Sequence, residues 1–89
     1  MQKLMKNHLA DEARRKETER IIRKGMVDQD MLYLEELALA MGKSRPVISK
    51  RLSGNSWSLE EMVKLVKVLR LSTEDAAIIL GVTTKGGRT

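Results

Sequence analysis

The stretch GKSRPVISKRLSG, residues 42–54, combines dense positive charge with apolar residues at helical spacing. It contains four basic residues and no acidic one, and a glycine closes each end. Ile48 and Leu52 are four positions apart, so a helix would place them on one side. The other side would hold Pro46, Ser49, Lys50 and Ser53. The pattern predicts a short helix that packs through its apolar side and presents small, polar and cationic residues to solvent.

The start of this helix has two possible registers. Ser44 can cap it with Arg45 first and Pro46 second, or Arg45 can occupy the cap with Pro46 first. Proline restricts the residue before it away from helical geometry, and it is best tolerated where no amide partner is lost. The second register is therefore favoured. In either register we expect a helix of about eight residues that ends before Gly54.

Amphipathic helices are predicted on both sides of this segment. The preceding one ends at Gly42 and has a stripe at helical spacing, formed by Leu34, Leu37, Ala38 and Met41. The following one begins with a capping box, in which Ser58 and Glu61 each satisfy a free amide of the other. Its apolar face is predicted to consist of Leu59, Met62, Val63, Val66 and Leu69, widened by Leu65 and Val68.

Two further helices complete the expected set. The first is predicted to begin at Asp11, as its cap, and to stop at Gly25. The last is predicted to begin after Ser72 or Thr73 and to end at Gly81. Together with the three helices above, they predict an all-α, compact bundle of four to five helices that contains a helix-turn-helix.

The length and composition fit one small folded domain. The chain has 89 residues, of which 42% are hydrophobic and 33% charged, so it lies outside the disordered class. Its one proline, six methionines and two aromatic residues favour packed helices over a sheet. We expect an arm or helical extension over residues 1–10, the helix-turn-helix domain over 11–82 and a flexible tail over 83–89.

Several classes of function find no support in the sequence. There is no cysteine and only one histidine, so neither a disulfide framework nor a metal site of the usual ligands is expected. No nucleophile and base stand at catalytic spacing and no glycine-rich phosphate loop is present, so we expect neither an enzyme nor a cofactor. No apolar run reaches the roughly 20 residues of a membrane span, which favours a cytoplasmic protein without a membrane partner.

The positive charge is segregated along the chain. Residues 1–24 carry eight basic and four acidic groups, residues 25–42 carry four acidic groups and no basic one, and residues 43–56 carry four basic groups and no acidic one. A concentrated cationic patch on a small domain is typical of proteins that bind a polyanion, because neutralising phosphates releases counterions. Double-stranded DNA is therefore the expected partner, and the helix in residues 42–54 has the dimensions and surface to enter its major groove.

The segment YLEELALAMGKSRPVISKRLSGNSWSLEEMVKLVKVLRLS, residues 33–72, resembles the core of lambda-repressor-like, Cro-type helix-turn-helix domains, which occur in phage repressors and related bacterial regulators. The matching features are ELA followed by MG, the small capping residue Ser44, and VISKRLSG before a capped apolar helix that ends in LRL. The resemblance extends over about residues 17–82. It implies a five-helix DNA-binding domain that commonly acts as a dimer on a two-fold related operator.

The resemblance also implies which residues meet DNA. It places base contacts on Arg45, Pro46, Ser49 and Lys50. It places phosphate contacts at Ser44 and in the loop after the helix, and with the basic neighbours the predicted set is Lys43, Ser44, Arg51, Ser53, Gly54, Asn55 and Ser56. Pro46 can offer only shape or a contact with a thymine methyl. Arg51 stands where the family commonly has an apolar residue, so its partner is either a phosphate or an acid on a neighbouring helix.

The last helix predicts a homodimer, because apolar residues surround it almost completely. Ile78 and Val82 share one side that has no obvious partner within the chain, unless the N-terminal arm folds back over Ile78. A protein-interaction role on the same fold, as in an antitoxin or an adaptor, is the alternative function. Binding to duplex DNA should weaken steeply with salt, which distinguishes the two.

Overall fold

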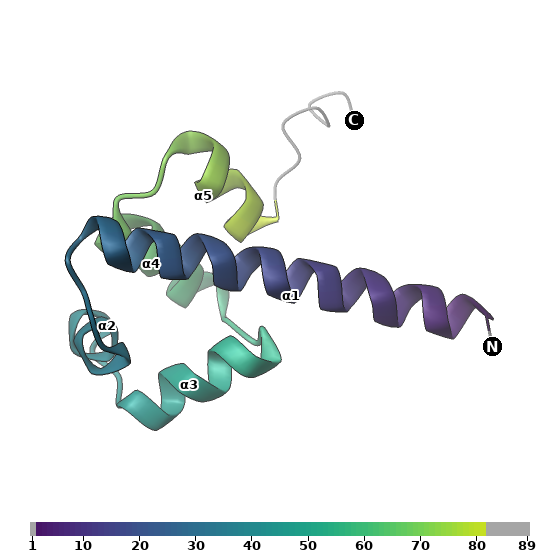
Figure 1. The fold of residues 1–89 in the computed structure, drawn as a ribbon, viewed down its shortest axis with the longest axis horizontal. Coiled ribbons are helices and arrows are strands. Elements are labelled where there is room, and N and C mark those ends of the chain that lie inside the picture. Colours follow the sequence, from purple (N-terminus) through teal and green to yellow (C-terminus); the bar gives the residue numbers. More distant parts are fainter. Residues whose placement is uncertain (1, 82–89) are drawn as a thin grey trace.

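The computed structural model describes the backbone of residues 2–81 and the side chains of residues 12–81. The order of elements is α1 (Gln2–Asp28), α2 (Leu34–Met41), α3 (Arg45–Gly54), α4 (Leu59–Leu69) and α5 (Thr73–Leu80). No strand occurs between residues 2 and 81, which confirms the all-α prediction. The long α1 crosses the bundle, with α3 along one side of it and α5 along the other (Figure 1).

All five helices contribute to one core. The buried apolar side chains are Ile21, Ile22, Met26, Leu37, Ala38, Met41, Ile48, Leu52, Trp57, Leu65, Leu69 and Ile79. A helix of eight to eleven residues, such as α2, α4 and α5, is marginal alone in water, so these helices owe their stability to this shared burial. Trp57, the only tryptophan, lies in the connection between α3 and α4 and is 9% exposed, and its Nε1 is buried without a hydrogen-bond partner.

The predicted limits of the first helix were wrong at both ends. The helix begins at Gln2, so Asp11 lies inside it, and it continues through Gly25 to Asp28. Gly25 is buried, and a Cβ atom added there would lie 3.0 Å from the Cβ of Leu69. The glycine therefore allows α1 to approach α4 closely, and it does not end the helix. The left-handed residue that reverses the chain is Asp30, with φ of 60°.

The N-terminal part of α1 extends beyond the bundle. Residues 2–10, for which an arm or a helical extension was expected, are helical and continuous with the part of α1 that packs on the core. In Figure 1 this end of α1 points away from the other four helices. A fold-back over α5 is therefore not what the structure shows, and Ile78 on α5 is 41% exposed.

The limits of α3 also differ from those predicted. Ser44 is the cap, Arg45 the first helical residue and Pro46 the second, so the favoured register was wrong. Pro46 is tolerated because it still lies in the first turn, where amides have no partner within the helix. The helix runs through Gly54, and Asn55 takes the left-handed position with φ of 50°.

The caps of α4 and α5 confirm the predicted signals, whereas the predicted face of α4 was partly wrong. Ser58 accepts a hydrogen bond from the amide of Glu61, and Ser72 caps α5 in the same way through Asp75. Within α4, Leu59 is 66% and Val63 39% exposed. Leu65 and Leu69 are buried as predicted, Met62 and Val66 pack partly buried against the core, and Glu61 is buried as well. The side of α4 that faces the core is therefore rotated by about one residue from the centre of the predicted apolar face. As a result Glu61 is buried, and Leu59 and Val63 are exposed.

Replacing Gly25 with alanine should destabilise the protein. In an open helix this change would gain up to about 1 kcal/mol. Here the new methyl would also lie 3.1 Å from Leu71 Cδ2 and 3.2 Å from Leu69 Cδ1, and overpacking of this kind costs about 1–3 kcal/mol. We expect a lower free energy of unfolding in urea. Gly54→Ala is the control, because the nearest atom to its Cβ would be Ser56 Oγ at 3.6 Å. Equal or greater stability of Gly25→Ala would contradict the close-packing argument.

Candidate nucleic-acid interface

The turn between α2 and α3 fixes the direction in which α3 leaves. Gly42 adopts a left-handed conformation with φ of 71°, and the amide of Lys43 donates to the carbonyl of Ala38 at 2.9 Å. These bonds close the end of α2 and start α3 three residues later. Ile48 and Leu52 are 1% and 5% exposed, so the predicted inner side of α3 is confirmed. The side of α3 opposite these residues is left open to a partner.

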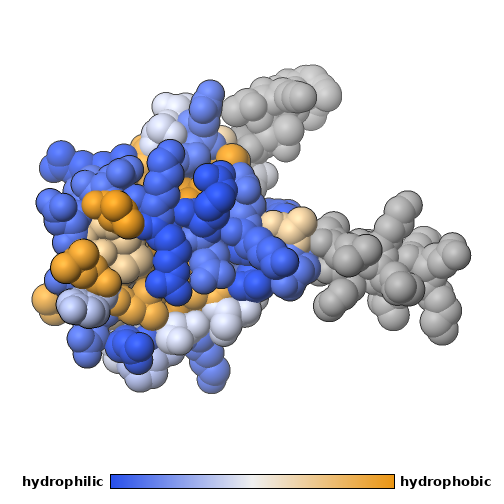
Figure 2. Space-filling view, viewed as in Figure 1, coloured by the Kyte–Doolittle hydropathy of each residue, from blue (hydrophilic) through white to orange (hydrophobic). Residues whose placement is uncertain are grey.

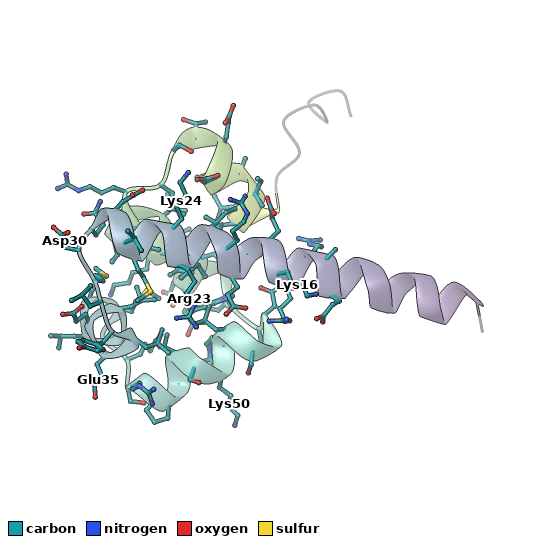
Figure 3. The ribbon with its side chains drawn as sticks, viewed as in Figure 1. Lys16, Arg23, Lys24, Asp30, Glu35 and Lys50 are labelled. Atoms are coloured by element: carbon teal, nitrogen blue, oxygen red, sulfur yellow. The ribbon has the colours of Figure 1, made fainter. Side chains whose placement is uncertain are left out.

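The four residues with predicted base contacts, Arg45, Pro46, Ser49 and Lys50, are all exposed on α3. Figure 3 shows the Lys50 side chain pointing away from the bundle. Among the side chains described, neither Arg45 nor Lys50 forms an ion pair that would compete with DNA. The outer side of α3 therefore offers two available cations, one at its first residue and one near its middle.

The residues with predicted phosphate contacts lie at the two ends of α3 and in the connections that flank it. Lys43 and Ser44 precede α3, Ser53 and Gly54 are its last two residues, and Ser56 follows it; these five are exposed, whereas Asn55 and Arg51 are half-buried. The structure thus brings the predicted set to one surface formed by α3 and its two flanking connections. Whether each residue touches a phosphate remains a prediction.

Arg51 is bound to an acid on a neighbouring helix, which is one of the two partners that the sequence left open. Its Nε donates to Glu61 Oε1 at 3.0 Å, and the same oxygen accepts the amide of Ser58 at 2.9 Å. The other oxygen, Oε2, lies 3.5 Å from the Nζ of Lys43. The Glu61 carboxylate, 7% exposed as a residue, therefore joins α3, the α2–α3 turn and the cap of α4. We call Glu61, Arg51 and Lys43 the carboxylate cluster.

The carboxylate cluster strongly favours the charged form of Glu61. The hydrogen bond from Arg51, the backbone hydrogen bond from Ser58 and the charges of Arg51 and Lys43 lower the pKa of Glu61 from 4.5 to about 2, against the opposing effect of burial. Sequence reasoning had assigned Glu61 only to the cap. The signal that could have found the cluster is Arg51, a charged residue where the helix would otherwise present an apolar one.

Several basic residues of α1 form ion pairs with acids of the same helix. Arg15 pairs with Glu12 and Glu19, Arg20 pairs with Glu17, and Arg23 pairs with Glu19, all at helical spacing of three or four residues. Such surface pairs contribute little stability, but they reduce the positive field on this side of the molecule. Arg14, Lys16 and Lys24 form no ion pair with a described side chain, so α1 also keeps unpaired positive charge.

No group of three metal-ligating side chains occurs in the part of the chain that the structure describes. Within the same residues, none of the helices has both the length and the apolar character needed to cross a membrane.

The arrangement of α2, turn and α3, with a third helix capped behind them, defines a helix-turn-helix domain. A family model described as helix-turn-helix matches residues 22–75, and the chain belongs to this family, in its lambda-repressor-like form. The matched span begins in the packed half of α1 and ends in α5. Searches of characterised proteins and of solved structures gave no significant match. The family supports a DNA-binding regulator in general terms.

The low pKa of Glu61 should make stability depend on pH. The carboxyl titrates near 4.5 in the unfolded chain and at about 2 in the folded one. Its contribution is therefore fully present above pH 4.5 and is lost as the pH falls toward 2. We expect the free energy of unfolding to decrease over this interval by more in the wild type than in Glu61→Gln, measured by urea denaturation at several pH values.

The control for this measurement is Glu60→Gln, since Glu60 is exposed on the same turn. Its pH dependence should resemble that of the wild type. Parallel curves for the wild type and Glu61→Gln would show that the cluster does not hold the carboxylate in its charged form.

Proposed function

We propose that this chain is a transcriptional regulator that binds double-stranded DNA in a sequence-specific manner and reads the major groove with α3. The observation that carries the proposal is the two-sided character of α3. Ile48 and Leu52 anchor one side in the core, while the exposed side presents Arg45 and Lys50 without ion-pair partners among the described side chains. A regulator of this kind would act on DNA in the cytoplasm of its host.

Each residue on the outer side has a distinct proposed role. Arg45 and Lys50 can donate to the guanine acceptors O6 and N7 in the major groove, and Ser49 can donate or accept at either base. Pro46 contributes shape or a contact with a thymine methyl. Phosphate contacts are proposed for Lys43, Ser44, Arg51, Ser53, Gly54, Asn55 and Ser56. Such contacts set the register on the duplex, and the base contacts supply the preference among sequences.

The test of the proposed function is selection of bound duplexes from a random library. A sequence-specific regulator should enrich one consensus, and a two-fold related consensus would additionally indicate two copies on the site. Recovery of duplexes without any consensus would contradict sequence-specific reading. The affinity for the selected duplex should also fall steeply between low and moderate salt.

Arg45→Ala and Lys50→Ala should each weaken binding to the selected duplex by about 1–3 kcal/mol and weaken binding to unrelated DNA by less. The reason is that a base contact is lost only where the matching base is present. Fluorescence anisotropy with both duplexes measures the difference. Lys24→Ala is the control, because Figure 3 places Lys24 and Lys50 on opposite sides of α1. Equal losses on both duplexes would reassign Arg45 or Lys50 to the phosphates.

A protein-interaction role on the same fold has one observation in its favour. Leu32 is 78%, Tyr33 66% and Leu39 82% exposed, and no basic residue occurs among residues 25–42. Figure 2 shows apolar side chains gathered at the end of the molecule that holds the connection between α1 and α2. An antitoxin or adaptor could use this surface to bind another protein. Binding that is insensitive to salt and independent of duplex DNA would favour this second function.

We further propose a homodimer formed through α5. Ile78 is 41% exposed, and Val82, its predicted neighbour in the interface, lies outside the described residues. A two-fold contact there could place two copies of α3 about one DNA turn, roughly 34 Å, apart. A single α3 of ten residues touches only a few base pairs, so pairing would raise specificity.

Ile78→Asp should convert this dimer to a monomer without unfolding it, because a charged residue in an apolar contact loses its solvation. Light scattering at high micromolar concentration, with and without the selected duplex, measures the mass, and circular dichroism reports folding. Leu39→Asp, at an exposed residue of α2, should leave the mass unchanged. A monomeric wild type under both conditions would rule out the dimer.

A further inference from the structure

In the carboxylate cluster, one nearly buried carboxylate, Glu61, binds a cation from each end of α3. Lys43 lies in the turn before α3, and Arg51 lies in the last turns of α3. Both contact Glu61, whose side chain is only 9% exposed, while the side chains of Lys43 and Arg51 are 39% and 31% exposed. The negative charge is thus shielded from solvent, and the two cations reach from it to the surface.

We propose that Glu61 is a positioning residue for contacts with the DNA backbone. It holds Arg51 by one edge of the guanidinium and Lys43 at the opposite end of α3, so that both cations already lie where phosphates of a bound duplex would pass. This inference deepens the proposed function and rests on it. No role in DNA binding follows for Glu61 from the predicted contact set, which contains only residues of α3 and its flanking connections.

The geometry of Arg51 allows it to bind two anions at once. Nε is the only atom of its guanidinium for which a hydrogen bond to another side chain is found within residues 12–81. A guanidinium has five N–H donors in a fixed plane, so a contact through Nε leaves donors on the terminal amino groups for a phosphate. A lysine at this position would have one ammonium group on a flexible stem and could not present a comparable planar edge to each anion.

Holding the side chain in advance reduces the cost of binding. A free arginine on a helix surface samples many rotamers, and ordering such a side chain in an interface costs conformational entropy. The bond to Glu61, which is itself fixed by the Ser58 amide, restricts Arg51 before DNA arrives. Leu52, the next residue, is buried and fixes the backbone from which Arg51 extends.

The test compares Glu61→Ala with Glu60→Ala, using the full chain and the selected duplex. Both variants remove one negative charge from the first turn of α4, but only Glu61 contacts Arg51 and Lys43 in the structure. The measured quantity is the slope of the logarithm of the binding constant against the logarithm of salt concentration. Loss of a positioned phosphate contact should reduce this slope by about 1 in Glu61→Ala, and Glu60→Ala should retain the wild-type slope.

Arg51→Lys keeps the test decisive if Glu61→Ala does not fold. If charge alone mattered, lysine would contact the phosphate as well as arginine does and the slope would not change. If positioning through Nε matters, Arg51→Lys should lose about as much slope as Arg51→Ala, on the order of 1. A wild-type slope in Arg51→Lys, or in folded Glu61→Ala, would overturn the positioning role alone. Failure of the wild type to bind any duplex would overturn the proposed function and this inference together.

Discussion

The burial of Ile48 and Leu52 is the interaction on which the DNA-binding surface depends. A ten-residue helix with a proline in its first turn and three serine or glycine residues among its positions has little tendency to form alone. It is helical here because these two side chains insert into a core built by the other four helices. The exposed side of α3 contributes little to this core, so its residues can change without loss of the fold.

Electrostatics divides the molecule into two kinds of basic surface. On α1, Arg15, Arg20 and Arg23 form ion pairs with glutamates one turn away, which partly neutralise their charge. On α3 and its flanking turn, Glu61 is the one acid that pairs with Lys43 and Arg51 among the side chains of residues 12–81. Net charge along the sequence does not separate these cases, because residues 1–24 and 43–56 both carry a surplus of four positive charges. The distribution of acids separates them: residues 43–56 contain none, whereas Glu12, Glu17 and Glu19 stand among the basic residues of α1.

The sequence predicted the elements that local chemistry determines. The apolar stripe of α2, the glycine at its end, the capping box of α4 and the inner side of α3 all follow from spacings within one helix, and all are present. The predictions fail where the end of a helix or the burial of a residue depends on a contact with a residue far along the chain. Gly25 was read as a stop, yet it serves the approach of Leu69, which is far along the chain. The chain leaves α1, α3 and α4 through Asp30, Asn55 and Arg70, which take the left-handed conformation without being glycine, whereas α2 and α5 end at the predicted glycines.

In the candidate site, too, features set within one helix were predictable and features set by contacts between helices were not. The exposed residues of α3 could be assigned from a helical wheel and a family resemblance, because their positions depend on α3 alone. The contacts of Glu61 could not, because they depend on the distance between side chains of α4, α3 and the turn before α3. Likewise the exposure of Leu59 and Val63 follows from how α4 is rotated against α1 and α2, which the pattern within α4 leaves undetermined.

The position of Trp57 gives the protein a built-in optical reporter. It is the only indole in the chain, it is almost fully buried, and it lies in the connection that links α3 to α4. Its emission therefore senses the polarity at one defined junction, whereas far-ultraviolet circular dichroism averages over all five helices. An opening confined to the junction behind α3 would alter the emission while leaving the dichroism unchanged, so local release of α3 can be told apart from global unfolding in the unlabelled protein.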